Sequence, residues 1–294
     1  MTVTHGQFKK ETTMQKHSFG IRGLSVFLAI LIAVFVVPVS VYADALESIG
    51  NDETVETPIE EENTALTRLS AEVFEDTSLR EENVKHFRLA DGSYIAYAYG
   101  MPIHTRGEDG LWQDIDNTLT ASGDSYVTPG ARVKFAKKIT GNEALFTLHD
   151  GNRKLTMSLD GAIKKTKGIA VNTETQLDES ADLLQKLTTL DKLTSRITYY
   201  GILSGVDLEY VVDGVNVKEN IIVNEKQDAY TYSFTLALNN LEATLLPDGA
   251  VIIEDADTGE TVYTVPAPTV FDADGIAAPD GAAYYTLTQS GNKI

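Results

Sequence analysis

The stretch that decides the fold is Val206–Val223, which reads VDLEYVVDGVNVKENIIV. Apolar and polar residues largely alternate on both sides of Asp213-Gly214, so each half has the period of two that is typical of a half-buried β-strand. An Asp-Gly pair between two such runs is a strong short-range signal for a β-hairpin. The sequence therefore predicts two antiparallel strands joined at Asp213-Gly214.

The same pattern recurs on both sides of this hairpin. The further runs are Phe87–Leu89 and Tyr94–Tyr99 around Asp91-Gly92, Leu145–His149 and Lys154–Leu159 around Asp150-Gly151, and Thr231–Leu238, Leu241–Leu246, Val251–Glu254 and Val262–Val265. Short strands at regular spacing with Asp-Gly turns are typical of an antiparallel sandwich or of stacked sheets.

One segment departs from the period of two. Residues 177–193, LDESADLLQKLTTLDKL, carry leucines at helical spacing behind acidic residues, which predicts an amphipathic helix. The predicted fold class is therefore mostly β, with antiparallel β-sandwich-like halves and one amphipathic helix between them.

The N-terminus has the order of a secretory signal peptide. Basic residues precede the apolar run Val26–Val37, and the small-residue pattern Val41-Tyr42-Ala43 follows. We expect cleavage after Ala43, with Ala45 as the second choice. An uncleaved membrane anchor is the alternative, but the run is shorter than the ~20 residues of a spanning helix, and Pro38 ends it.

These patterns divide the chain into five predicted parts. They are a signal peptide over 1–43, an acidic and largely disordered spacer over 44–83, an N-terminal β-rich half over 84–168, a linker with the amphipathic helix over 169–194, and a C-terminal β-rich half over 195–294. The spacer is assigned from its Glu, Asp and Thr content, because such a segment cannot bury enough apolar surface to order itself.

Composition narrows the partners and the compartment. The chain has 294 residues, 43% of them hydrophobic, and a net charge of -19. Without a dense Lys/Arg cluster in the mature chain, we expect no nucleic-acid partner, and contact with the membrane only through the signal peptide during export. The chain has no cysteine, so disulfides cannot stabilise it. We predict a secreted, extracellular or cell-wall-associated protein of a Gram-positive-type cell.

Three histidines lie in the mature chain, His86, His104 and His149, and none has metal-ligand spacing to another. No Gly-x-Ser-x-Gly motif is present to position a nucleophile. We interpret His104 as a strand histidine bonded to a backbone partner. The sequence therefore predicts no catalytic, cofactor-binding or metal-binding residue, no cofactor, and a protein that is not an enzyme.

Several acidic patterns have two interpretations. Asp207 and Glu209 share one face of a strand, where they could serve a glycosidase or hold Ca²⁺, but ion pairing with Lys218 across the hairpin is favoured. Two acidic loops resemble parts of a calcium loop, but both are shorter than the standard pattern and are interpreted as turns. These loops are Asp255, Asp257 and Gly259, and Asp272, Asp274 and Gly275.

Two other features can be explained without a ligand. Trp112, the only tryptophan, could stack on a sugar, but a place in the core is favoured. Lys164, Lys165 and Lys167 form a small basic spot that we interpret as a solvated loop.

Several phrases of the sequence together resemble a known family. They are Pro102-Ile103-His104 with Gly110–Leu119, Leu193–Tyr199 leading into Gly205–Tyr210 and Val217–Val223, and Asp257–Glu260 with Pro266–Pro268 and Asp272–Gly275. Their order and spacing are similar to the N-terminal region of Gram-positive secreted RHS/YD-repeat, wall-associated proteins. In those proteins a DNRLRE module and the repeats follow this region. Neither the module nor the repeats are present here, so the resemblance is to the leading section only.

The resemblance implies a non-catalytic surface module, structural or adhesive, with cell-wall or surface components as partners. The alternative function is a carbohydrate-binding β-sandwich, with or without the help of calcium, acting on cell-wall or extracellular glycan. A glycoside hydrolase is a third class, with Asp207 and Glu209 as the pair to test.

Overall fold

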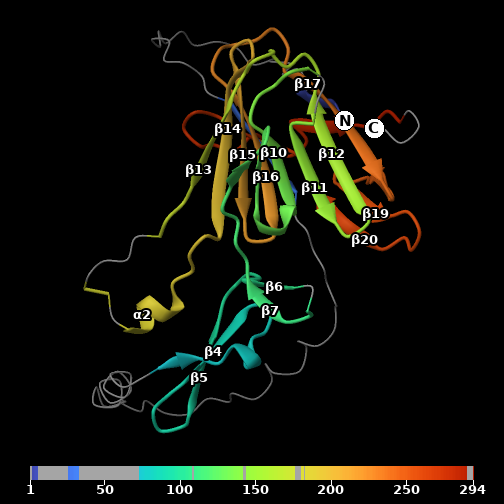
Figure 1. Ribbon diagram of the computed structural model, residues 1–294. Helices are drawn as coiled ribbons and strands as arrows, with labels where there is room; N and C mark the ends of the chain where they lie inside the picture. The colour runs from blue at the N-terminus through green and yellow to red at the C-terminus, as the bar shows by residue number, and fades with distance from the viewer. Residues whose placement is uncertain are drawn as a thin grey trace, which may run out of the picture. The chain divides into compact units, whose positions relative to one another are not determined.

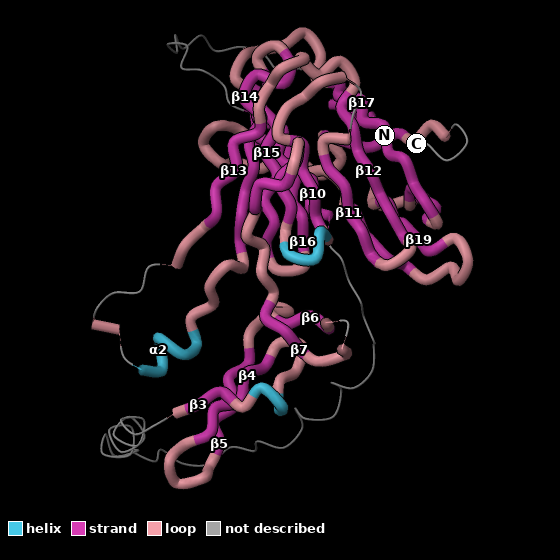
Figure 2. The backbone as a smooth tube through the Cα atoms, in the orientation of Figure 1, coloured by secondary structure: helices cyan, strands magenta, loops and turns pink. Residues whose placement is uncertain are grey.

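The computed structural model describes residues 2–5, 26–32, 73–107, 109–141, 144–175, 180–181, 183–289 and 294 (Figure 1). The chain divides into two compact units. Unit 1 consists of Met1–Phe35, Asp116–Glu174 and Asp191–Ile294, and unit 2 consists of Val36–Ile115 and Thr175–Leu190. Both are built mainly from antiparallel strands, so the predicted mostly-β class is confirmed (Figure 2).

The described residues of unit 1 form three antiparallel sheets. The first has the strand order β22 (Ala283–Thr286), β1 (Thr2–His5), β17 (Thr231–Asn239), β12 (Arg153–Leu159), β11 (Phe146–Asp150), β10 (Val133–Ala136), β9 (Ser125–Val127) and β8 (Thr120–Ser122). The second has the order β13 (Gly168–Asn172), β14 (Thr194–Leu203), β15 (Val206–Asp213), β16 (Asn216–Val223), β2 (Val26–Ile32) and β21 (Thr269–Phe271). The third consists of β18 (Leu241–Leu245), β19 (Val251–Asp255) and β20 (Thr261–Val265).

The first two sheets pack face to face over one hydrophobic core. Phe135 of β10 and Phe146 of β11 are fully buried, and their rings lie 5.3 and 5.4 Å from the ring of Tyr210 on β15. Inward-facing residues alternate with partly exposed ones along β15 and β16, as the period of two requires. This contact between sheets gives unit 1 a sandwich-like arrangement.

The buried side chain of Asn117 forms hydrogen bonds at the turn of the β15–β16 hairpin. Gly214 has a φ of 56°, a backbone conformation that glycine adopts without steric penalty. The Nδ2 of Asn117 donates to the carbonyl oxygens of Leu193 and Gly214 at 2.7 and 2.8 Å, and its Oδ1 accepts from Arg132 at 3.0 Å. Asn117 therefore gives each of these carbonyls a second donor, beside the Gly214 amide that bonds Leu193 and the Arg132 guanidinium that bonds Gly214.

Unit 2 is smaller, and its described residues form two short sheets. They are β3 (Phe74–Glu75), β4 (Val84–Arg88) and β5 (Tyr94–Ala98), and the ribbon of β6 (His104–Arg106) and β7 (Trp112–Asp114). The 3-10 helix η1 (Thr77–Leu79) joins β3 to the β4 hairpin, and α2 (Leu183–Thr188) belongs to this unit as well. A second 3-10 helix, η2 (Pro129–Ala131), lies in unit 1.

The Asp-Gly hairpins lie where the sequence predicts them, but the helix is shorter than predicted. Of residues 177–193 only Leu183–Thr188 forms a helix, while residues 176–179 and 182 lie outside the described part. The Oγ1 of Thr189 donates to the Gln185 carbonyl, and Lys192 has a φ of 58°, so the chain leaves the helix before Leu193. β-Branched threonines at this end also lower helix propensity.

Other predicted boundaries are crossed by strands. β13 (Gly168–Asn172) crosses from the predicted N-terminal half into residues 169–172 of the predicted linker, and β3 and η1 lie in the predicted spacer. β1 and β2 come from the predicted signal peptide, whose apolar run also has the composition of a buried strand. Ala43 lies outside the described residues, and cleavage there stays a prediction. No helix in the described part of the chain has the length and apolar character that crossing a membrane requires.

Candidate functional site

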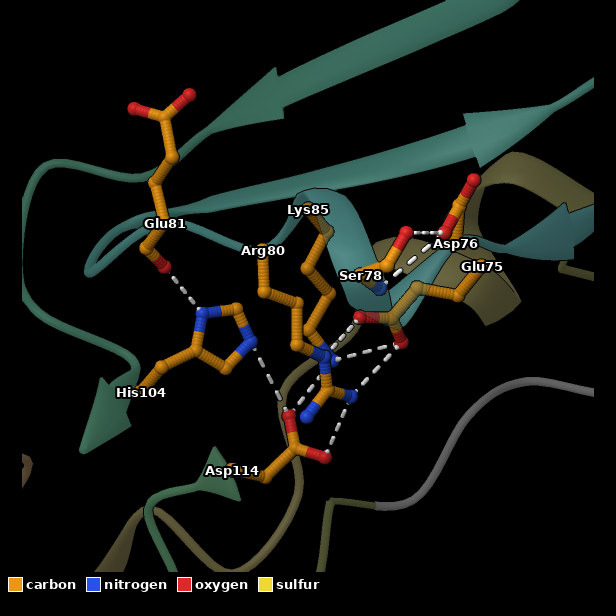
Figure 3. Close-up of polar contacts among 8 residues, drawn as sticks. All are labelled: Glu75, Asp76, Ser78, Arg80, Glu81, Lys85, His104 and Asp114. Atoms are coloured by element: carbon orange, nitrogen blue, oxygen red, sulfur yellow. Dashed lines mark hydrogen bonds and ion pairs between the residues drawn. The ribbon is translucent and has the colours of Figure 1, made fainter. Parts of the chain in front are cut away.

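A cluster of charged side chains gathers within unit 2 (Figure 3). Five residues from separate turns and strands meet there: Glu75 of β3, Arg80 after η1, Lys85 of β4, His104 of β6 and Asp114 of β7. The register of the β6–β7 ribbon places His104 directly opposite Asp114. We call these five residues the Asp114 cluster.

Three cationic or basic side chains converge on the Asp114 carboxylate. The Nη2 of Arg80 lies 2.9 Å from Oδ2, the Nζ of Lys85 lies 3.0 Å from Oδ1, and the Nε2 of His104 lies 3.5 Å from Oδ1. Arg80 also holds Glu75 through Nε at 2.5 Å and Nη2 at 3.1 Å. The geometry is that of a forked guanidinium binding planar anions.

Burial differs sharply among these side chains. The side chain of His104 is fully buried, those of Arg80 and Lys85 are 9% and 11% exposed, and that of Asp114 is 55% exposed. Asp114 is therefore the most exposed member of these pairs and lies on the solvent side of the cluster.

The hydrogen bonds of His104 fix its tautomer. Its Nδ1 lies 2.5 Å from the carbonyl oxygen of Glu81, which can only accept, so Nδ1 carries the proton. Burial lowers the pKa of His104, and the charges of Arg80 and Lys85 lower it further. Its Nε2 has no hydrogen-bond partner among the described residues. At neutral pH His104 is therefore a neutral base with a free lone pair beside two cations.

Asp114 stays ionised for the complementary reason. Partial burial opposes the charge, but the hydrogen bond from Lys85 and the charges of Lys85 and Arg80 outweigh burial and hold the pKa of Asp114 below its ordinary value. The cluster thus holds two carboxylates, those of Glu75 and Asp114, in a cradle of donors from Arg80 and Lys85. Phosphate presents similar oxygens, and Arg and Lys are its common ligands in proteins.

The other histidines stand apart from this arrangement. His149 is exposed on β11 in unit 1, and His86 faces away from Lys85 because neighbouring strand residues alternate. The expected backbone partner of His104 is present, namely Glu81. The sequence prediction missed Glu75, Arg80, Lys85 and Asp114, which no spacing rule connects.

Trp112 lies on the surface ribbon and not in the hydrophobic core. It is half-buried, and the Arg106 guanidinium lies 3.9 Å from its ring centroid. The interpretation as a core anchor is therefore wrong, because Trp112 is not among the buried hydrophobic residues.

Asp207 and Glu209 share a face, but Lys218 is not their partner. Glu209 accepts from Asn220 at 3.0 Å and pairs with Arg196 at 3.8 Å. Asp207 accepts from the backbone of Gly201 at 2.6 Å. The register places Lys218 opposite Val211, so the expected ion pair is wrong.

The acidic loops use their carboxylates within their own turns. Asp255 accepts from the backbone amides of Asp257 and Thr258, and Asp272 accepts from that of Asp274. Gly259 and Gly275 have φ angles of 71° and 78° in these turns. Within the described ranges no group of three or more metal-ligating side chains comes together.

Comparison with known proteins finds three similar chains, all of them named as tRNA nucleases. The tRNA nuclease WapA of Bacillus subtilis strain 168 is 28% identical over 265 residues, which cover 86% of this chain and 11% of that protein. The tRNA3(Ser)-specific nuclease WapA of Bacillus spizizenii and the tRNA(Glu)-specific nuclease WapA of Bacillus subtilis subsp. natto are each 27% identical over the same shares. The chain thus spans about a tenth of the length of these relatives. No family model and no solved structure matches.

These matches correct several expectations. The relatives are named tRNA nucleases, so the resemblance to RHS/YD-repeat, DNRLRE-containing wall-associated proteins is not upheld. The same names overturn the non-catalytic surface module, leave its glycan-binding alternative unsupported, and contradict the predictions of no enzyme and no nucleic-acid partner. The prediction about partners rested on the lack of a dense Lys/Arg cluster along the sequence, which says nothing about how cations are grouped on the folded surface.

Proposed function

We propose that this chain acts in a tRNA-directed nuclease and that the Asp114 cluster is the site that engages an RNA phosphate. The names of the relatives supply the substrate class. The site is assigned from one observation, namely that Arg80, Lys85 and His104 converge on the exposed carboxylate of Asp114. An RNA phosphodiester would displace Asp114 and take its donors.

The chemistry that fits this cluster is RNA cleavage without a metal. The ribose 2′-hydroxyl attacks the neighbouring phosphorus, and the Nε2 of His104 accepts the hydroxyl proton. Arg80 and Lys85 stabilise the extra negative charge on the phosphate oxygens. The bond from phosphorus to the 5′-oxygen breaks, and that oxygen takes a proton from water. The products are a 2′,3′-cyclic phosphate and a 5′-hydroxyl, and His104 returns its proton to solvent.

Changing His104 to Asn tests the base. The Asn amide nitrogen takes the place of Nδ1 and keeps a donor for the Glu81 carbonyl, while the base at Nε2 is lost. We expect tRNA cleavage to fall about 100-fold or more, the usual contribution of a general base. The assay follows labelled tRNA fragments and their cyclic-phosphate ends. Unchanged fluorescence of Trp112, which lies in the same unit, checks that the variant folds.

The matched control is His149→Gln, an exposed histidine in the other unit, which should leave cleavage unchanged. Cleavage by His104→Asn at the wild-type rate would remove His104 from the mechanism. A wild-type chain that leaves tRNA intact would contradict the proposed function.

Changing Asp114 to Asn tests the phosphate cradle separately from the chemistry. Asn has the same shape but no charge, so Arg80 and Lys85 lose a competing carboxylate. We expect inorganic phosphate to bind at least several-fold more tightly to the variant, measured by calorimetry. The folded state should lose no more than about 1 kcal/mol, because this side chain is more than half exposed. Equal or weaker phosphate binding would contradict the cradle.

The location of the protein is inferred from its N-terminal sequence and not from the Asp114 cluster. The relatives come from Bacillus, which agrees with the expected Gram-positive type of cell. We infer export to the cell exterior or wall from the order of basic, apolar and small residues in 1–43.

A further inference from the structure

Five lysines gather at one corner of unit 1, although the chain carries a net charge of -19. Lys138 and Lys167 pair in an antiparallel bridge, and Lys164 and Lys165 form the turn before it. Lys137 flanks the group, with its Nζ 2.8 Å from the Gly123 carbonyl. Sequence alone showed only three of them as a solvated loop, because Lys137 and Lys138 are distant along the chain.

The backbone holds these lysines in a rigid frame. The amide of Lys165 donates to the Ile139 carbonyl at 2.7 Å, and the amide of Ile139 donates to the Thr166 carbonyl at 2.8 Å. The amide of Gly168 donates to the Lys137 carbonyl at 3.0 Å. The two segments therefore present their side chains from fixed positions.

Two features of these segments destabilise the folded chain when no ligand is bound. Like charges directly opposite each other, as in the Lys138–Lys167 pair, repel. Lys165 has a φ of 75°, where Gly or Asn would be less strained. In the part of the chain that the structure describes, none of the five lysines forms an ion pair with a carboxylate. An anionic ligand would relieve the repulsion and supply the missing counter-charge.

An exposed aromatic side chain adjoins this group. Gly168 pairs with the buried Tyr199, so Tyr200, the next residue of β14, lies beside Lys167 on the opposite, solvent-facing side. Tyr200 is 64% exposed. Cations next to an open aromatic ring are the combination with which proteins hold single-stranded nucleic acid, through phosphates and stacked bases.

We propose that this basic-aromatic surface, formed by Lys138, Lys164, Lys165, Lys167 and Tyr200, binds the phosphates and an unpaired base of RNA. The inference rests on the proposed nuclease function for its ligand, and it assigns RNA binding to a surface of unit 1, outside the Asp114 cluster. Tyr200 favours RNA over a phosphate polymer without bases. The acidity of the rest of the chain does not prevent this, since charges beyond about 10 Å are largely screened at 0.1 M salt.

The test is binding of fluorescently labelled tRNA to the full chain, followed by anisotropy over a range of salt concentrations. The variant combines Lys138→Gln, Lys165→Gln and Lys167→Gln. The control combines Lys154→Gln, Lys186→Gln and Lys226→Gln, three exposed lysines elsewhere, and removes the same charge. Losing three phosphate contacts should reduce the slope of log binding constant against log salt concentration by roughly 2 in magnitude. It should also weaken binding about 100-fold near 0.1 M salt. The control should bind nearly as the wild type does.

A further arm separates RNA from other polyanions. Tyr200→Ala should weaken tRNA binding about tenfold and leave binding of a glycerol-phosphate polymer unchanged. Equal binding of both polymers, with no effect of Tyr200→Ala, would overturn the assignment to RNA. Equal affinities and slopes for the two triple variants would overturn the surface itself. Binding through these lysines without cleavage would uphold this inference and refute only the proposed nuclease function.

Discussion

Raising the pH from 4.5 to above 8 is expected to destabilise unit 1 by up to about 5 kcal/mol through the single carboxyl group of Glu219. Glu219 lies on β16 with no exposed surface, directly opposite Tyr210 of β15. Burial raises its pKa to about 8, and a contact with the Tyr210 hydroxyl opposes this only in part. Neither carboxyl oxygen has a well-formed hydrogen bond to any described residue.

The direction follows from proton counting. Above about pH 4.5 the unfolded chain releases the Glu219 proton, whereas the folded chain keeps it up to about pH 8. The unfolded state therefore binds fewer protons throughout this window, and the free energy of unfolding falls as the pH rises. Above pH 8 both states are ionised and the contribution no longer changes.

Glu219→Gln should remove this dependence. We expect the variant to match the wild type near pH 5 and to exceed it by several kcal/mol at pH 9, measured by urea unfolding with far-UV circular dichroism. Fluorescence of Trp112 monitors unit 2 and should not change. The control is Glu242→Gln, an exposed carboxylate on β18, which should leave the pH profile as it is. A Glu219→Gln profile parallel to the wild type would show that another group titrates.

The second large effect is expected from Phe146→Ala. Phe146 is fully buried, and its ring stacks on Phe135 at 5.5 Å and on Tyr210 at 5.4 Å. Removing it deletes one of the aromatic contacts that join the two large sheets and leaves a cavity between them. Phe→Ala changes at such sites typically cost about 3–5 kcal/mol. Urea unfolding of unit 1 should show a lower midpoint, and the free energy of unfolding derived from it should fall by that amount.

Tyr200→Ala is the matched control for this change, since it also removes an aromatic ring from unit 1. The ring is 64% exposed, so the free energy of unfolding should change by no more than about 0.5 kcal/mol. If Phe146→Ala cost as little as Tyr200→Ala, the stacked rings could not be holding the sheets together.

The features that sequence predicts here are the local ones. The hairpins β4–β5, β11–β12 and β15–β16 each depend on alternation around one Asp-Gly turn, and these signals lie within about 20 residues. Glu219 was also visible in principle, because it occupies an inward position of β16 between Val217 and Ile221.

Sequence reasoning failed where the fold joins distant segments. The Asp114 cluster unites Glu75, Arg80, Lys85, His104 and Asp114, and the pairing of His104 with Asp114 depends on the register of a ribbon whose strands are short. The five lysines meet only because Lys138 bridges Lys167. No periodicity within either segment encodes that meeting.

The strand order of the largest sheet has a consequence for the chain as it is synthesised. β12 pairs on one side with β11, a few residues away, and on the other with β17, in which Leu238 is the partner of Leu155. The β11–β12 hairpin can close early, but its second edge must wait until β13 to β16 have emerged. During that delay its backbone donors and acceptors are open to other chains. We therefore expect this edge to be the part of the nascent protein most in need of a chaperone.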